Sequence, residues 1–230
     1  MSSSGTGTKV WDTPVRCVHW MLAVAVIGAW WTGENLDEWF TVHQYCGYAI
    51  IVLVVFRLGW GLFGTRTARF ASFLVGPAAV IGHLRLLRDR ALPAHAGHPP
   101  SGGWAALCIW AVLLLQGLMG LFANDEVMNT GPFYGWVAPE TSNWLSGLHH
   151  EVGEWIPVLV LLHVAAVLVY RFWAGQPLVL AMLTGRRPDV SPTEDIGAEL
   201  WLRAVLWLVV VAAVFVALLW AAPPAVLEAF

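Results

Sequence analysis

Four histidine positions lie within or at the edge of long apolar stretches of this sequence: His19, His43, the adjacent pair His149 and His150, and His163. Ionisable side chains inside a membrane span cost free energy and usually have a function. Any single histidine of this kind is as readily explained by a hydrogen bond to a neighbouring helix. Imidazole is also a common axial ligand of haem iron, so the four positions together are candidate metal ligands.

The elements that must position these histidines are membrane helices. Of the 230 residues, 58% are hydrophobic and only 12% are charged, whereas ordinary soluble domains carry about 25% charged residues. This composition excludes a soluble domain and also a disordered chain, which needs low hydrophobicity and high charge. Three cysteines are too few for a disulfide scaffold, and the 15 tryptophans suit membrane–water interfaces.

Five apolar stretches are each long enough for a membrane helix, which needs about 20 mostly apolar residues. They are continuous rather than alternating, which disfavours the strands of a membrane barrel. The sequence therefore predicts an all-α membrane protein. The expected spans are roughly Cys17–Gly33, Val42–Phe63, Trp104–Ala123, Leu148–Phe172 and Leu200–Ala222.

The segment Pro77–Leu92 differs from the spans because it is amphipathic. Its apolar residues recur at helical spacing, while Arg85, Arg88 and Arg90 fall on another face. This pattern predicts an interfacial helix that lies on the membrane surface. The later segment Gly185–Glu199 is charged and contains proline, so we expect a loop before the fifth span.

The basic residues set the orientation of the chain in the membrane. With five spans, all twelve Lys and Arg residues fall on one side, from Lys9 and Arg16 to Arg203. The opposite loops are acidic and contain no basic residue. Basic loops stay in the cytoplasm, so we expect the N-terminus inside and the C-terminus outside. The acidic residues of the outer loops are Glu34, Asp37, Glu38, Asp125, Glu126 and Glu140.

This topology sorts the histidines into two pairs by depth. His19 and His163 fall near the cytoplasmic face, and His43 and His149 fall near the outer face. The fourteen residues from His149 to His163 correspond to about 21 Å along a helix. That length leaves room for two planar macrocycles, one above the other. A haem iron takes two axial ligands, and a four-helix bundle is a natural place to hold them.

Helical phase favours His149 over His150 as the second ligand on the fourth span. Fourteen residues at about 100° each end 40° short of four full turns, so His149 and His163 share a face. Thirteen residues end about 140° short, so His150 lies on a different face. Pro157 stands between the two positions and can kink the helix, which leaves His150 as an alternative.

Two glycines stand four residues after candidate ligands. Gly47 follows His43, and Gly153 follows His149, in the same relative position. Residues four apart share a helix face, and a missing side chain there lets a flat ring approach the backbone. Gly47 and Gly153 are therefore expected to border a haem.

Two arginines near the membrane edge could bind haem propionates. Arg16 and Arg57 could form charge-assisted hydrogen bonds to those groups, or could simply extend to the membrane surface. His83, His95 and His98 lie in the basic connection between the second and third spans, where we expect solvated side chains. No C-x-x-C-H occurs, which excludes a covalent c-type haem.

Five short motifs occur in the order typical of one family, and the chain resembles the bacterial cytochrome b561 and nickel-iron hydrogenase cytochrome b family over about residues 9–188. The similar segments are W-D-T-P-V-R-C-V-H-W at Trp11–Trp20, H-Q-Y-C-G-Y at His43–Tyr48, F-R-L-G-W-G at Phe56–Gly61, G-H-P-P-S-G-G-W at Gly97–Trp104, and the stretch from His149 to Arg186.

The resemblance implies a four-helix transmembrane bundle that binds two b haems and exchanges electrons with quinone. Its ligand positions fall on His19, His43, His149 and His163, the same residues that depth and phase favour. We expect residues 1–188 to form this di-haem domain and residues 189–230 to add a loop and an extra transmembrane helix. The family implies a multi-pass protein of the bacterial inner membrane.

The leading interpretation is an electron-transfer subunit rather than a catalyst alone. It would connect the quinone pool with a periplasmic redox partner, such as a hydrogenase, a c-type cytochrome or a dehydrogenase. A stand-alone superoxide:quinone oxidoreductase is an alternative, which the acidic outer loops disfavour because superoxide is an anion. A non-haem anchor or metal transporter is a further alternative. Lipid and quinone are expected partners, and nucleic acid is not.

Overall fold

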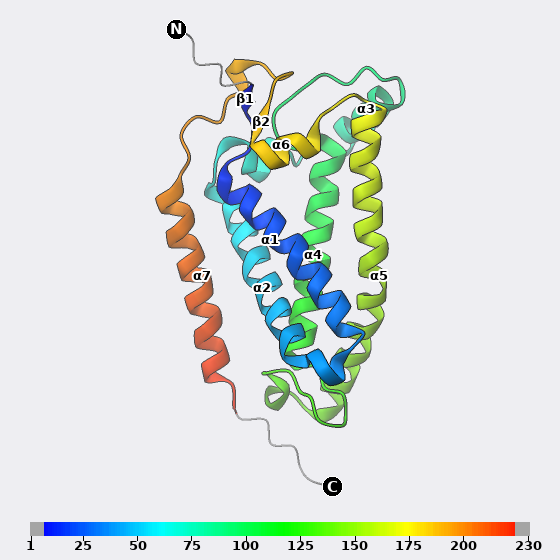
Figure 1. Cartoon of the computed structure of the whole chain (residues 1–230), viewed down its shortest axis with the longest axis vertical. Coiled ribbons are helices and arrows are strands. Elements are labelled where there is room, and N and C mark those ends of the chain that lie inside the picture. Colours follow the sequence, from blue (N-terminus) through cyan, green and yellow to red (C-terminus); the bar gives the residue numbers. More distant parts are fainter. Residues whose placement is uncertain (1–6, 224–230) are drawn as a thin grey trace. The chain divides into compact units, whose positions relative to one another are not determined.

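A computed structural model of the chain describes residues 7–223. Its five long helices, from α1 in blue to α7 in orange and red, are apolar enough to cross a membrane (Figure 1). The described residues otherwise form short helices and two strands of two residues each. The prediction of an all-α membrane protein is therefore confirmed. The long helices are α1 (Thr13–Gly33), α2 (Leu36–Phe63), α4 (Pro100–Phe122), α5 (Pro139–Phe172) and α7 (Trp201–Ala221).

Four of these helices begin earlier than their apolar stretches do. The first turn of α2 carries Asp37 and Glu38, and α5 begins at Pro139 and Glu140. Carboxylates stabilise a helix N-terminus through the helix dipole, and proline suits the first helical position because it needs no hydrogen-bonded N–H there. The polar flanks therefore extend the helices beyond their apolar stretches.

The predicted amphipathic helix is present as α3 (Pro77–Arg88), with Pro77 in its first turn. It ends four residues before the predicted end at Leu92. Arg90 adopts a left-handed backbone conformation with φ of 56°, which stops helical hydrogen bonding. The placement of α3 on a membrane surface stays a prediction.

Short elements lie between the long helices and connect segments that are distant in the sequence. Strand β1 (Thr8–Lys9) pairs antiparallel with β2 (Arg186–Arg187), and α6 (Leu178–Thr184) directly precedes β2. The remaining pieces are short 3₁₀ helices. They are η1 (Arg66–Ala68), η2 (Phe70–Ser72), η3 (Tyr134–Trp136) and η4 (Pro192–Glu194). The segment expected to be only a loop before the fifth span thus contributes β2 and η4.

The described residues form two compact units. Unit 1 comprises residues 7–19, 57–109 and 161–205, and unit 2 comprises residues 20–56, 110–160 and 206–223. Each unit therefore contains parts of α1, α2, α4 and α5. His19 and His163 belong to unit 1, whereas His43 and His149 belong to unit 2.

Within unit 2, α7 packs against α2. The rings of Tyr48 and Phe215 lie 5.5 Å apart, and the indole N–H of Trp207 donates to the carbonyl of Phe56 at 3.0 Å. Phe215 is also part of a buried cluster with Ile51, Leu121 and Phe133. The fifth long helix therefore contributes to the apolar core of this unit. The proposed domain division between residues 188 and 189 stays a prediction.

Candidate functional site

In unit 1, α1 and α5 bring His19 and His163 face to face. Their imidazole centroids are 6.4 Å apart, and the ring planes are tilted by 53°. The two residues are 144 positions apart in the sequence, so only the packing of the helices can create this pair. The depth argument predicted the same pairing.

A buried carboxylate fixes the start of α1 beside the end of α2. Asp12 is 0% exposed, and its Oδ1 accepts the backbone N–H of Val15 at 2.7 Å, as an N-cap does. Its Oδ2 accepts the indole N–H of Trp60 at 3.0 Å and the hydroxyl of Thr65 at 2.5 Å. Three donors thus satisfy one carboxylate. This arrangement holds the helix that carries His19.

His98 lies close to the unit 1 histidines, which corrects the expectation that it is solvated. Its ring packs between Trp11 and Phe73, with centroids 4.8 Å and 4.7 Å away. Burial lowers the pKa of His98 to about 3, with further lowering by the nearby charge of Arg57. His19 and His163 contribute to the same lowering, so they also lie within electrostatic reach.

The two arginines that were candidates for haem propionates have different surroundings. Arg57 on α2 is buried, with 3% of its surface exposed. Arg16 on α1 donates from Nε to the carbonyl of Met182 at 3.3 Å and from its guanidinium to the carbonyl of Leu183. Arg16 thereby joins α1 to the end of α6. Both belong to unit 1, and of the two only Arg57 is buried.

In unit 2, α2 and α5 bring His43 and His149 together, with ring centroids 6.0 Å apart. His43 Nδ1 lies 2.8 Å from the carbonyl of Ala29, and His149 Nδ1 lies 3.0 Å from the carbonyl of Gln116. A carbonyl can only accept, so each Nδ1 carries the proton. The Nε2 atom of each neutral ring then has a free lone pair, as a metal ligand requires.

Glycines on the neighbouring helices leave space in which these two rings lie close to the helix backbone. A Cβ added at Gly120 on α4 would lie 2.8 Å from Cε1 of His149. A Cβ added at Gly33 on α1 would lie 3.2 Å from Cε1 of His43. Sequence reasoning missed both glycines. A usable signal was that Gly33 and Gly120 lie near the expected outer ends of their spans, as His43 and His149 do. Each leaves room for an imidazole against a helix backbone.

A cavity of about 410 Å³ borders the unit 2 pair, and both predicted glycines line it. A Cβ added at Gly47 would meet nothing within 4 Å, so the backbone is open to the cavity there. A Cβ added at Gly153 would lie 3.2 Å from Nε2 of Gln116, so that position is tighter. Gln116 Nε2 in turn donates to the carbonyl of His149 at 2.7 Å.

His150 occupies a different position from His149. Its side chain is 82% exposed, and its Nε2 lies 3.4 Å from a carboxylate oxygen of Glu154. It also lines the same cavity as His43 and His149. The helical phase argument predicted this difference. The assignment of His149 as the ligand stays a prediction.

The spacing of both pairs suits an iron atom between the rings. A metal–imidazole bond is about 2 Å long, so two ligands on opposite sides of a metal place their ring centroids roughly 6 Å apart. The observed values of 6.4 Å and 6.0 Å agree with this spacing. Among the described residues, no three or more His, Cys, Asp or Glu side chains converge on one metal position. Each site therefore offers two ligands, which fits bis-histidine haem.

His83 also differs from the expectation of a solvated residue, since it is only 7% exposed. Its Nε2 lies 2.7 Å from the hydroxyl of Tyr170, and that hydroxyl lies 3.0 Å from the hydroxyl of Ser101. Burial lowers the pKa of His83, as does the neighbouring His95. This chain of hydrogen bonds attaches α3 to α4 and α5 within unit 1.

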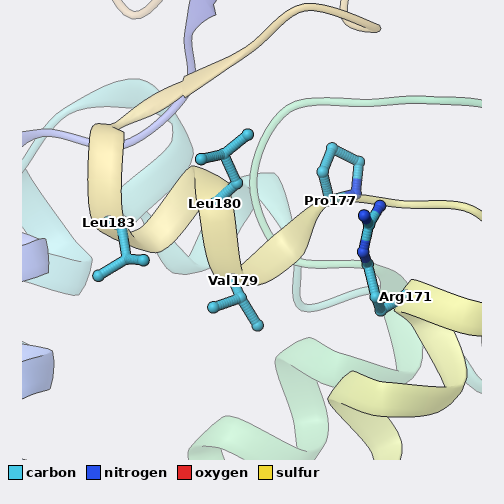
Figure 2. Close-up of a pocket in the computed structure, with 5 residues that line it drawn as sticks. All are labelled: Arg171, Pro177, Val179, Leu180 and Leu183. Carbon is cyan, nitrogen blue, oxygen red and sulfur yellow. The ribbon is translucent and has the colours of Figure 1, made fainter.

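A second cavity of about 370 Å³ lies beside the end of α5 and the short helix α6. Figure 2 shows Arg171 extending from α5 toward Pro177. The other lining residues are Val179, Leu180 and Leu183, so the walls are apolar and one cation stands at the edge. Such a groove can accept a flat apolar molecule that carries a hydrogen-bond acceptor.

Charged residues are divided sharply between the two units. All twelve Lys and Arg residues belong to unit 1, together with six Asp and Glu residues. The described residues of unit 2 include no Lys or Arg and eight acidic residues. These are Glu34, Asp37, Glu38, Asp125, Glu126, Glu140, Glu151 and Glu154.

Comparison with known proteins agrees with these sites. The family described as prokaryotic cytochrome b561 matches residues 10–185. Two curated relatives, from Azotobacter chroococcum mcd 1 and Azotobacter vinelandii, are each described as a probable Ni/Fe-hydrogenase B-type cytochrome subunit. Each is 23% identical over 219 residues, covering 79% of this chain and 89% of the relative. No solved structure matches significantly.

Proposed function

Because the chain belongs to the prokaryotic cytochrome b561 family, a group of membrane electron-transfer cytochromes whose b type implies haem b, we propose that it binds two haems and connects the quinone pool with a periplasmic redox protein. The observation that carries this proposal is the presence of two histidine pairs at haem spacing, one in each unit. The protein would act as an electron-transfer subunit rather than as a catalyst alone.

In this proposal His19 and His163 hold one haem, and His43 and His149 hold the other. Bound haem supplies one-electron redox chemistry, and the chain supplies ligands and surroundings. In unit 2, the carbonyls of Ala29 and Gln116 fix the orientation of the rings and direct Nε2 to the metal position.

The distribution of charge supports an orientation with unit 1 toward the cytoplasm of the bacterial inner membrane. All Lys and Arg residues are in unit 1, as the preference of basic loops for the cytoplasm requires. Unit 2 would then face the periplasm and meet the redox partner, which could be a hydrogenase, a c-type cytochrome or a dehydrogenase. The acidic character of unit 2 disfavours superoxide as a substrate because it repels anions.

The cavity beside α6 is the best candidate for the quinone site. Its apolar walls, formed by Val179, Leu180 and Leu183, suit a quinone ring and tail. Arg171 can donate a hydrogen bond to a quinone carbonyl oxygen. The substitution Leu180→Trp would fill the cavity and should raise the KM for a soluble quinol several-fold.

The test of the proposed function is the haem content of the purified protein. Reduced-minus-oxidised spectra should show b-type bands, and a pyridine haemochromogen assay should give two haems per chain. Addition of a quinol should reduce at least one of them. A preparation that folds and carries no haem b would overturn the proposal, and one haem per chain would overturn its di-haem part.

A further inference from the structure

The unit 1 histidine pair shares its surroundings with a buried cation. Arg57 is 3% exposed, so solvent and salt screen its charge weakly. Arg57 stands about one turn before Trp60 on α2, and the Trp60 indole donates at 3.0 Å to Asp12 at the start of α1, the helix that carries His19. The positive charge therefore acts in the environment where the pair lies.

One acidic group offsets part of this charge. Asp12 is buried in the same unit and interacts electrostatically with Arg57. Its oxygens, however, accept hydrogen bonds from Val15, Trp60 and Thr65. Unit 1 as a whole holds twelve basic and six acidic residues, so cations dominate its field.

The unit 2 pair has the opposite surroundings. Glu34, Asp125 and Glu154 line the cavity that contains His43 and His149. The described part of unit 2 contains no Lys or Arg that could offset these carboxylates. All charged side chains in the described part of unit 2 are therefore acidic, and the three that line the cavity are exposed.

Adding an electron to a haem lowers its charge by one. A nearby cation therefore stabilises the reduced form, and nearby anions stabilise the oxidised form. We infer that the buried charge of Arg57 holds the unit 1 haem at a higher reduction potential than the unit 2 haem, whose surroundings are purely acidic. This inference rests on the proposed function, because it requires a haem at each pair.

The potential difference gives electron transfer a preferred direction. An electron that enters at unit 2 moves to unit 1, where the reduced form is more stable. The net direction between partner and quinone is set by the potentials of those two couples, and the haem order sets where the electron resides at equilibrium. Arg57 is thus a residue that sets the potential, not a ligand or a catalytic residue.

The experiment is a redox titration of the full chain in nanodiscs of zwitterionic lipid, followed by visible spectra. The variant His43→Ala should retain only the unit 1 haem and thereby identify its midpoint. Arg57→Gln should lower that midpoint by at least tenfold in the reduction equilibrium, which is about 59 mV for one electron. Arg57→Lys, which keeps the charge, should retain most of the wild-type value.

Exposed charges provide matched controls. Arg69→Gln removes an exposed arginine of unit 1 and should shift the midpoint much less, because solvent screens that charge. In unit 2, Glu154→Gln should raise the midpoint of the other haem by less than Arg57→Gln lowers that of the unit 1 haem, because Glu154 lines the cavity but its side chain is 67% exposed. Glu140→Gln, an exposed residue outside the cavity lining, should have a smaller effect.

Two outcomes would overturn the inference. One is a unit 2 haem with the higher midpoint in the wild-type protein. The other is an Arg57→Gln protein with two haems and an unchanged midpoint. If Arg57→Gln does not fold, the order of the two midpoints in the wild-type protein and the Glu154→Gln and Glu140→Gln pair still decide, since those two variants remove charge at exposed positions. Failure of the proposed function is distinct, because it would appear as fewer than two haems per chain before any titration.

Discussion

The two histidine pairs have nearly the same ring spacing, but different groups hold them. In unit 1, the surroundings are polar and charged, with Asp12 and Arg57 buried and His98 partly buried. In unit 2, backbone carbonyls and glycines hold the rings, and no cation is present among the described residues. One ligand geometry can therefore be built with or without buried charge. We expect the difference in charge to change the reduction potential of a bound haem more than the geometry of its ligands.

The largest effect should come from removing one ligand of each pair in turn. His163→Ala should abolish haem binding in unit 1, and His149→Ala should abolish it in unit 2, so each variant keeps one haem of two. Haem-to-protein ratios and redox titrations measure both losses. His150→Ala is the control and should keep both haems. Loss of both haems from either single variant would show that the two sites are not independent.

The next largest effect should come from the polar anchor of unit 1. Asp12→Ala removes an N-cap and leaves the buried donors of Trp60 and Thr65 without an acceptor, which should cost about 3 kcal/mol or more. Thermal unfolding of the haem-loaded protein measures this loss. Asp89→Asn, at an exposed position of unit 1, should change stability little. Equal losses from the two variants would contradict the role assigned to Asp12.

Alanine substitutions at two glycines of unit 2 should distinguish an effect on protein packing from an effect on haem binding. Gly120→Ala places a methyl group 2.8 Å from the His149 ring and should cost about 1–3 kcal/mol even without haem. Gly47→Ala meets no protein atom within 4 Å, so the haem-free chain should keep its stability. If a haem fills the cavity, Gly47→Ala should still lower haem occupancy. Unchanged occupancy would show that the haem does not approach Gly47.

Much of this architecture could be predicted because apolar length, basic residues and helical phase act along the chain. These signals located the five helices and predicted both histidine pairs, since a helix fixes the relative depth and face of its residues. The burial of His83 and the partial burial of His98 could not be predicted in the same way. Each is buried by partners distant in the sequence, such as Tyr170 for His83 and Trp11 for His98. The basic residues close to His83 and His98 in the sequence suggested solvated side chains and gave no indication of these distant partners.

The smallest predicted effect concerns pH and is confined to unit 1. Burial lowers the pKa of His83 in the folded protein, and Tyr170 and His95 are the titratable groups beside it. The unfolded chain then binds more protons than the folded chain, so stability is present above the unfolded pKa near 6.5 and is lost as pH falls. Acidification from pH 7 to about pH 5 should lower the free energy of local opening of α3 by about 1 kcal/mol or less, as hydrogen exchange at α3 amides would measure.

Two controls isolate His83. The substitution His83→Phe should remove this pH dependence while keeping an aromatic ring in place. Helix α7 carries no histidine, so its amides within unit 2 should show no such pH dependence. A pH response of α3 that persists in His83→Phe would assign the proton to another group and remove this difference between the units.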